Sequence, residues 1–270
     1  MIDPADAGQL EALLRRHRIT PRHRLGQNFL IDAGVRDRIA EAAGATGDDG
    51  VLEVGAGVGT LTIALAARAK SVVAVELDAS LLPALREVVG GRPNVTIVEG
   101  DILRLDVGAD IVAGNIPYNL TGALIRKLLD RPPRPRRISL VVQKEVAERW
   151  TAPTSASLAT VAVQVFTLPR VLLTIPAEAF EPRPKVDSGL VVLDVRPAPA
   201  VQVEDMDVFL RFVEAIFQFR RKQLGGTVAR MGSSKAAVAA AGIDPTRRPQ
   251  TLTLAEWEKL FRAVNAGADR

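Results

Sequence analysis

Short apolar runs alternate with helical patterns through the first part of the chain. Each run is rich in Val, Ile or Leu, too short to be a buried helix, and is expected to form a strand. The runs are Val51–Val54, Val72–Val75, Val95–Val98, Ile111–Ala113 and Ile138–Val142. Strands that alternate with helices form a parallel sheet with helices on both faces. The sequence therefore predicts an α/β fold.

The second part of the chain changes character after two more predicted strands. These strands are Pro169–Thr174 and Gly189–Val195, and Pro197-Ala198-Pro199 then resembles a linker. Beyond the linker only helical patterns occur, at Val208–Phe219, Ala236–Ala241 and Leu254–Val264. We therefore expect two domains, a large α/β domain over residues 1–196 and a small all-helical domain over residues 200–270.

The composition excludes several classes of chemistry. The chain has no cysteine and two histidines, His17 and His23. Disulfides, thiolate zinc sites and thiol nucleophiles are therefore excluded, and we expect no metal. No apolar run reaches the length of a membrane span, and the N-terminal segment is polar and rich in Arg rather than a signal peptide. We expect a soluble, cytoplasmic protein without membrane contact.

A glycine-rich turn follows the first predicted strand. Gly55, Gly57 and Gly59 come directly after Val54, and Glu76 ends the next strand. Glycine lets the backbone pass close to a ligand, and an acidic residue about 20 residues further on can accept hydrogen bonds from both ribose hydroxyls. The spacing is Gly-x-Gly-x-Gly rather than the Gly-x-Gly-x-x-Gly of dinucleotide enzymes.

The acidic residues near this turn favour a positively charged cofactor. Glu53 lies just before the glycines and would repel a pyrophosphate more than a sulfonium, so the charges favour S-adenosylmethionine over NAD. Asp101 follows the third strand and could bind the exocyclic amine of the cofactor adenine, with Ile102 packing on the ring. An Asx-type turn capped by Asp101 is the structural alternative. All these loops follow strand ends, where open α/β sheets bind ligands.

The turn Asn115-Ile116-Pro117-Tyr118 follows the fourth strand. An exocyclic amine on a planar base has two N–H donors, which the Asn115 side-chain oxygen and the Ile116 carbonyl could accept. The Tyr118 ring could cover the base, and Pro117 would keep the turn stiff. The structural alternative is a polar turn in which Asn115 caps and Tyr118 packs. The neighbouring cofactor loops favour base binding.

Arginine gathers in four basic clusters, although 35 Lys and Arg against 31 Asp and Glu give a net charge of only +4. A single cluster is equally well explained as a solvated face. Their joint occurrence favours an anionic partner, and phosphate contacts would weaken with salt. The clusters are Arg15–Arg24, Arg131–Arg137, Arg220–Lys222 and Arg247–Arg248.

Seven motifs, in order along almost the whole chain, resemble those of the ribosomal RNA adenine dimethylases. The likeness is to the bacterial enzymes that dimethylate two adjacent adenosines near the 3′ end of 16S rRNA. Any one motif could arise by chance, whereas seven in family order hardly could. The motifs are Gly26–Leu30, Glu53–Thr62, Glu76–Asp78, Gly100-Asp101, Asn115–Asn119, Gln143–Ala147 and Pro184–Ser188.

This resemblance implies a Rossmann-like methyltransferase sheet, an antiparallel last hairpin and a helical RNA-binding domain. It implies S-adenosylmethionine as cofactor and 16S rRNA in a small-subunit assembly intermediate as partner, and we expect a monomer. Asn115 through Tyr118 would hold the target adenine. Phe180 is similar in position to a family aromatic that sandwiches the flipped base, although its spacing equally fits the core. The implied cofactor contacts are Asn28, Leu30, Gly55, Glu76, Asp101 and Asn115.

The chain departs from the family pattern in two places. Thr151–Ser157 replaces an expected Tyr-Gly-x-Leu-Ser pattern, so the contacts of that loop do not transfer. Arg183 and Gly189-Leu190 replace Pro and Ala-Val around the Lys-Val-Asp-Ser motif. Both changes spare the methyl-transfer centre, but they could alter how RNA is held.

Three alternative functions share part of this pattern. The 23S rRNA adenine methylases of macrolide resistance share several motifs, but the C-terminal segments Gly242–Pro245 and Arg248–Leu252 resemble the small-subunit group. DNA adenine methylases have proline where Ile116 stands. A non-catalytic ribosome assembly factor would not need cofactor binding, and the intact cofactor residues argue against it.

Overall fold

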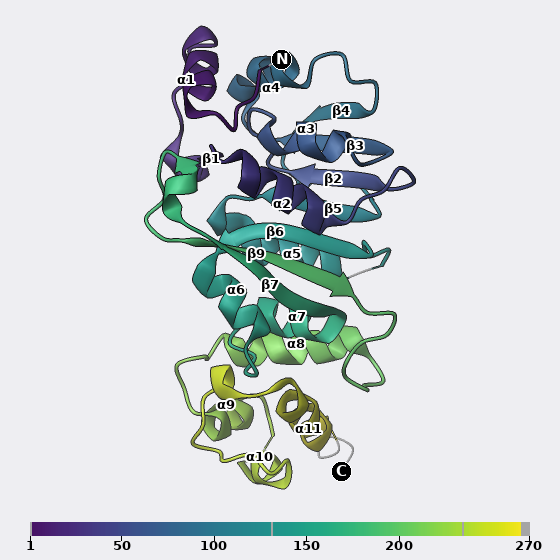
Figure 1. The fold of residues 1–270 in the computed structure, drawn as a ribbon. Helices are drawn as coiled ribbons and strands as arrows, with labels where there is room; N and C mark the ends of the chain where they lie inside the picture. Colours follow the sequence, from purple (N-terminus) through teal and green to yellow (C-terminus); the bar gives the residue numbers. More distant parts are fainter. Residues whose placement is uncertain (1, 131, 234, 266–270) are drawn as a thin grey trace. The chain divides into compact units, whose positions relative to one another are not determined.

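The computed structural model describes residues 2–130, 132–233 and 235–265 (Figure 1). The chain divides into two compact units. The first comprises Met1–Glu148 and Pro169–Val195, and the second comprises Arg149–Leu168 and Arg196–Arg270. The second unit thus includes Arg149–Leu168, which the sequence analysis placed in the large domain. Assignment of catalysis to one domain and RNA binding to the other stays a prediction.

A seven-stranded sheet has the order β4-β3-β2-β5-β6-β9-β7 (Figure 1). The strands β4, β3, β2, β5 and β6 run parallel to one another, whereas β9 runs antiparallel to β6. This arrangement confirms the predicted α/β fold class. The strands are β2 (Gly50–Val54), β3 (Ser71–Glu76), β4 (Val95–Glu99), β5 (Ile111–Asn115), β6 (Arg137–Gln143), β7 (Thr167–Ile175) and β9 (Ser188–Val195).

Helices cover the sheet because each buries an apolar face. On α2, Ile39 is fully buried in one cluster with Val51 and Ile111 of the sheet and Leu65 of α3. Figure 1 shows α2 and α3 in front of the strands, with α5 behind them. The helices that begin in the first unit are α1 (Ala7–Arg16), α2 (Ala33–Ala43), α3 (Thr60–Ala66), α4 (Leu82–Val89), α5 (Thr121–Leu129) and α6 (Lys144–Thr151).

The N-terminal segment is packed onto the first unit by apolar contacts. Leu10 and Leu13 of α1 lie in a cluster with Phe29 and with Val88 of α4. Further along, β1 (Phe29–Leu30) pairs with β8 (Phe180–Glu181) in an antiparallel two-stranded sheet. Pairs this short carry no periodic signal, so the sequence did not predict them.

The described residues of the second unit are mainly helical, with the start of β7 and an isolated β-bridge between Thr154 and Thr253. Its aromatic core includes an edge-on contact of Phe209 with Phe261, with ring centroids 5.4 Å apart. The sequence missed α9, because two glycines weaken its helical pattern. No helix among the described residues is long and apolar enough to cross a membrane. The helices are α7 (Leu158–Phe166), α8 (Met206–Phe217), α9 (Leu224–Arg230), α10 (Lys235–Ala240) and α11 (Leu254–Asn265).

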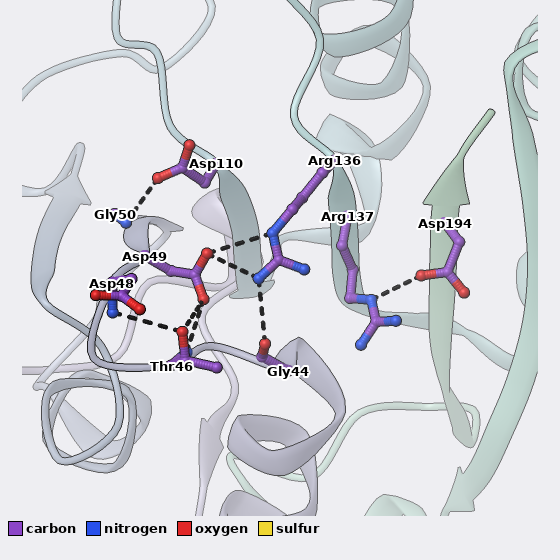
Figure 2. Close-up of polar contacts among 9 residues, drawn as sticks. All are labelled: Gly44, Thr46, Asp48, Asp49, Gly50, Asp110, Arg136, Arg137 and Asp194. Atoms are coloured by element: carbon purple, nitrogen blue, oxygen red, sulfur yellow. Dashed lines mark hydrogen bonds and ion pairs between the residues drawn. The ribbon is translucent and has the colours of Figure 1, made fainter. Parts of the chain in front are cut away.

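Ion pairs join the segments at the amino ends of the parallel strands (Figure 2). The Nη2 atom of Arg136 lies 2.8 Å from Oδ1 of Asp49. The other Asp49 oxygen accepts hydrogen bonds from the backbone N–H and the hydroxyl of Thr46, at 2.7 and 2.8 Å. Arg137, at the start of β6, donates to Asp194 of β9 at 2.7 Å. These contacts tie the loop before β2 to β6, and β6 to β9.

Replacing Asp49 by Asn should destabilise the protein in a pH-dependent way. Hydrogen bonds from Arg136 and Thr46 lower the pKa of Asp49 from 3.8 to about 2. A carboxylate with a lowered pKa stabilises the fold above its unfolded-state pKa, and loses this effect as pH falls through the folded-state value. The melting temperature of the variant should therefore lie below that of the wild type at pH 7, and the difference should shrink toward pH 3.

Asp48→Asn is the matched control, because the Asp48 side chain is exposed and its contact with Thr46 is made by the backbone N–H. Its melting temperature should follow that of the wild type. An equal loss in both variants, or a loss for Asp49→Asn that does not change with pH, would contradict the assigned ion pair.

Candidate active site

A cavity opens at the carboxyl ends of β2, β3 and β5. The strand order reverses between β2 and β5, and ligands bind open α/β sheets at such a switch point. Every predicted site residue except Phe180 lines the cavity. Those that line it are Asn28, Leu30, Gly55, Glu76, Asp101, Asn115, Ile116, Pro117 and Tyr118.

The glycine-rich turn is held against the end of β3. Gly55 and Gly57 adopt positive φ values of 73° and 59°, which glycine tolerates far better than other residues. The N–H groups of Gly55 and Ala56 both donate to the carbonyl of Val75, at 2.9 and 3.0 Å. The turn therefore brings bare backbone to the cavity wall, as the sequence predicted.

Glu76 is fixed in orientation by two backbone N–H groups. Its Oε2 atom accepts from Gly57 and its Oε1 atom from Asp78, both at 2.8 Å. Each carboxylate oxygen keeps a further lone pair that can accept another hydrogen bond. Asp78 in turn accepts from Gln27 at 2.7 Å and from Arg22 at 2.8 Å. The N-terminal segment is thus tied to the strand end that carries Glu76.

Asn115 has a fixed side-chain orientation. Its Nδ2 atom donates to the backbone carbonyl of Asn28 at 2.9 Å, which fixes the direction in which the acceptor atom Oδ1 points. The preceding residue, Gly114, lies so close to β2 that a Cβ atom there would be 2.5 Å from the Val54 carbonyl oxygen. Close strand approach and one hydrogen bond therefore set where Asn115 lies.

Asp101 caps an Asx-type turn, which was the structural alternative to cofactor binding. Its Oδ1 atom accepts from the backbone N–H of Leu103 at 3.0 Å, and Oδ2 lies 3.6 Å from Nε of Arg104. Ile102 is buried and, like Asp101, lines the cavity. Capping the turn and lining the cavity are compatible, so contact with a cofactor adenine stays a prediction.

Phe180 lies in the core rather than at the cavity. It is 2% exposed, pairs with Leu30 across the short β1–β8 sheet, and belongs to the same apolar cluster as Ile39. This position favours the core interpretation that its spacing had left open. Stacking on a flipped base stays a prediction for Phe180. Among the residues that line the cavity, the aromatic ones are Phe29 and Tyr118.

Glu53 is a cavity residue, and one of its two carboxyl oxygens lacks a hydrogen-bond partner among the described residues. It is 1% exposed, and its Oε2 atom has no hydrogen-bond partner among the described residues. Burial, together with the nearby Glu76 carboxylate, raises the pKa of Glu53 to about 8. A cation bound beside it would favour its ionised form. The carboxyl groups of Glu53 and Glu76 therefore fit a positively charged ligand better than a pyrophosphate.

The structure uses several of the clustered arginines internally. Arg22 pairs with Asp78, Arg136 with Asp49 and Arg247 with Glu256. These side chains are therefore less available to phosphates than the sequence suggested. Arg131 lies outside the described residues. In the third cluster, Arg220, Arg221 and Lys222 are all exposed.

The sequence did not reveal the residues whose hydrogen bonds hold the cavity residues in place. Asp78 and Gln27 lie within quoted motifs, yet their hydrogen bond joins positions 51 residues apart, and nothing local indicates it. Ser188 also lies in a quoted motif, and its hydroxyl contacts that of Tyr118 at 2.8 Å. Motif spacing marked these residues without revealing their partners.

Comparison with known proteins decides the family. The model of the family described as ribosomal RNA adenine dimethylase matches residues 18–266. The chain belongs to this family. Its members methylate adenine in ribosomal RNA, so the cavity at the switch point is the candidate active site of an rRNA adenine dimethyltransferase.

Curated relatives of the dimethylase family match nearly the whole chain. The ribosomal RNA small subunit methyltransferase A of Pelotomaculum thermopropionicum is 44% identical, covering 96% of this chain and 97% of its own. The protein of the same name from Geobacillus thermodenitrificans is 39% identical, with 97% of each chain covered.

Two solved structures of methyl-transferring enzymes have the same fold. The 23S rRNA methyltransferase ErmE is 29% identical with a TM-score of 0.69, covering 88% of this chain and 100% of that chain. A dimethyladenosine transferase from Plasmodium falciparum is 25% identical with a TM-score of 0.72, covering 89% and 98%. The predicted family and fold are therefore confirmed.

Replacing Glu53 by Gln should stabilise the ligand-free protein while weakening cofactor binding. Burial raises the pKa of Glu53 from 4.5 to about 8, because the fold penalises the ionised carboxylate. The folded protein therefore loses stability relative to the unfolded chain as the pH rises from about 4.5 to about 8. The melting temperature of ligand-free Glu53→Gln should therefore exceed that of the wild type increasingly over this range. Calorimetric titration with S-adenosylmethionine should show weaker binding by Glu53→Gln than by the wild type. Equal affinity for both proteins would contradict a cation-binding role.

Proposed function

We propose that this chain transfers methyl groups from S-adenosylmethionine to the N6 amines of two adjacent adenosines in the 3′-terminal hairpin loop of 16S rRNA. The product is N6,N6-dimethyladenosine, formed during small-subunit assembly in the cytoplasm by a monomeric enzyme. The observation that carries the proposal is the orientation of Asn115, whose acceptor oxygen Oδ1 is held in one direction by the hydrogen bond from Nδ2 to the carbonyl of Asn28.

The cavity residues are suited to hold S-adenosylmethionine. Glu76, with its carboxylate held by two N–H groups, would accept hydrogen bonds from the ribose hydroxyls. Asp101 and Ile102 would hold the adenine, and the turn at Gly55 would pass beside the methionine part. Asn28 and Leu30 would close the cavity from the N-terminal segment. When bound, the cofactor supplies an activated methyl group on a sulfonium.

Asn115 would prepare the target amine for attack. The lone pair of the adenine amine is delocalised into the ring, which makes it a poor nucleophile. Acceptance of its N–H groups by Asn115 Oδ1 and the Ile116 carbonyl would favour the pyramidal geometry that attack requires. Positioning of two reactants with exclusion of water can supply roughly 7 to 11 kcal/mol, so no strong base is needed.

The target adenine must leave its stack to reach this cavity. Unstacking costs a few kcal/mol and is cheapest in a loop, which suits a hairpin-loop substrate. Tyr118 would cover the flipped base, while exposed cations such as Arg220 and Arg221 would hold flanking phosphates. Transfer of a second methyl requires the monomethylated amine to turn within the pocket.

The alternative RNA substrate is 23S rRNA. The relatives named for the small subunit reach 44% identity, against 29% for the 23S rRNA methyltransferase ErmE, and this difference favours 16S rRNA. The test is to incubate the protein with labelled S-adenosylmethionine and undermethylated 30S or 50S particles, and to map the product. Dimethyladenosine in the 3′-terminal hairpin of 16S rRNA is expected. Label confined to 23S rRNA would overturn the proposal.

Asn115→Ala should keep the fold and lose most methyl transfer, because the acceptor for the target amine is removed. We expect a fall in kcat of about 100-fold or more, in the range of a lost transition-state hydrogen bond. Single-turnover assays on 30S particles measure it, with the melting temperature as the check on folding. Turnover at the wild-type rate would defeat the assigned role.

Replacement of both Arg220 and Arg221 by Ala should weaken RNA binding and reduce its dependence on salt. The logarithm of the affinity falls linearly with the logarithm of the salt concentration, and each lost phosphate contact makes this slope less steep by about one. Filter binding to the isolated hairpin over a salt series measures the slope. The control is Arg68→Ala, an exposed arginine just before the amino end of β3, whereas the cavity lies at the carboxyl end of that strand. A double variant with the slope of the control would exclude a phosphate clamp at this position.

A further inference from the structure

Two motifs that lie far apart in the sequence meet at the end of the sheet where β5 and β6 finish and β9 begins. Tyr118 follows β5, and Ser188 begins β9, 70 residues later. Both strands flank β6, where Asn115 pairs with Val141 and Ser188 pairs with Gln143. Because β9 is antiparallel to β6, the start of β9 lies at the same end of the sheet as the carboxyl ends of β5 and β6. The topology therefore brings Ser188 within reach of Tyr118, which lines the cavity.

The two side chains share a hydrogen bond. The Tyr118 hydroxyl lies 2.8 Å from Oγ of Ser188, which is fully buried and does not line the cavity. The neighbouring Asp187 is itself anchored, since its side chain accepts from the N–H of Ala177 at 3.2 Å and its carbonyl from the N–H of Lys144 at 3.0 Å. Ser188 is thus a rigid point of attachment.

We propose that Ser188 is a positioning residue that fixes the plane of the Tyr118 ring for the target base. The inference rests on the proposed function. The backbone of the short 3-10 turn Tyr118–Leu120 holds one end of the side chain, and Ser188 holds the hydroxyl at the other end. The hydroxyl oxygen lies on the long axis of the ring, so the contact with Ser188 fixes where that axis points. Because the O–H bond and the lone pair of a phenol lie near the ring plane, a hydrogen-bond partner held in place also favours one plane of the ring. The Lys-Val-Asp-Ser motif thereby acts on the reaction without touching the substrate.

Tyr118 is the only tyrosine of the chain, which gives the proposal a direct spectroscopic readout. Burial raises the pKa of Tyr118, the hydrogen bond with Ser188 opposes this shift, and the Asp187 charge adds to it. Titration of the near-ultraviolet absorbance of tyrosinate therefore follows this one side chain. Ser188→Ala should move its midpoint to higher pH than in the wild type.

The kinetic test uses single and double variants on 30S particles. Ser188→Ala should lower kcat by about three- to tenfold, the value of one hydrogen bond, while the KM for S-adenosylmethionine stays unchanged. Tyr118→Phe should show a similar loss, and the double variant should lose no more than either single variant, because one shared contact is removed in each.

Ser139→Ala is the matched control. Ser139 is also a fully buried serine, on the adjacent strand β6, and its Oγ atom has no hydrogen-bond partner among the described residues. This variant should keep the wild-type kcat and titration midpoint. An unchanged midpoint and kcat in Ser188→Ala, or losses that add in the double variant, would overturn the inference with the proposed function intact. A wild-type protein inactive on 30S particles would overturn both.

Discussion

The hydrogen bond from Asn115 to the carbonyl of Asn28 determines the arrangement of the site. It joins residues 87 positions apart, one at the end of β5 and the other in the N-terminal segment. Both residues line the cavity, and the contact fixes the direction in which the acceptor atom Oδ1 of Asn115 points. Close packing of Gly114 against β2 sets the position of the Asn115 backbone. The hydrogen bond to Asn28 then sets the orientation of the Asn115 side chain.

The N-terminal segment belongs to the site because three kinds of contact hold it there. Apolar packing of α1 on α4 supplies burial, and the short β1–β8 pair supplies backbone hydrogen bonds. Asp78 adds a charged anchor that accepts from both Gln27 and Arg22, while its own N–H binds Glu76. Asp78 therefore orients Glu76 and also holds the N-terminal segment. The charged contacts around Asp49, at the amino ends of the strands, serve stability instead.

The sequence predicted the sheet and most of the cavity because their signals are local. Valine-rich runs mark buried strands, and the glycine spacing marks a turn where backbone must face a ligand. Asp78, Ser188 and the Arg136–Asp49 pair act through contacts across 51 to 87 positions, which no local pattern encodes. Phe180 illustrates the same limit, since the short strand pair that buries it leaves no periodic trace.

The most direct test of the account is a crystal structure of the protein with S-adenosylhomocysteine and a short RNA hairpin that carries the target adenosines. The account predicts the N6 atom of one adenine at hydrogen-bond distance, about 2.9 Å, from Oδ1 of Asn115, with the Nδ2 bond to Asn28 kept. The Tyr118 ring should lie flat against that base. An adenine bound elsewhere, or an Asn115 side chain turned away from it, would contradict the central claim.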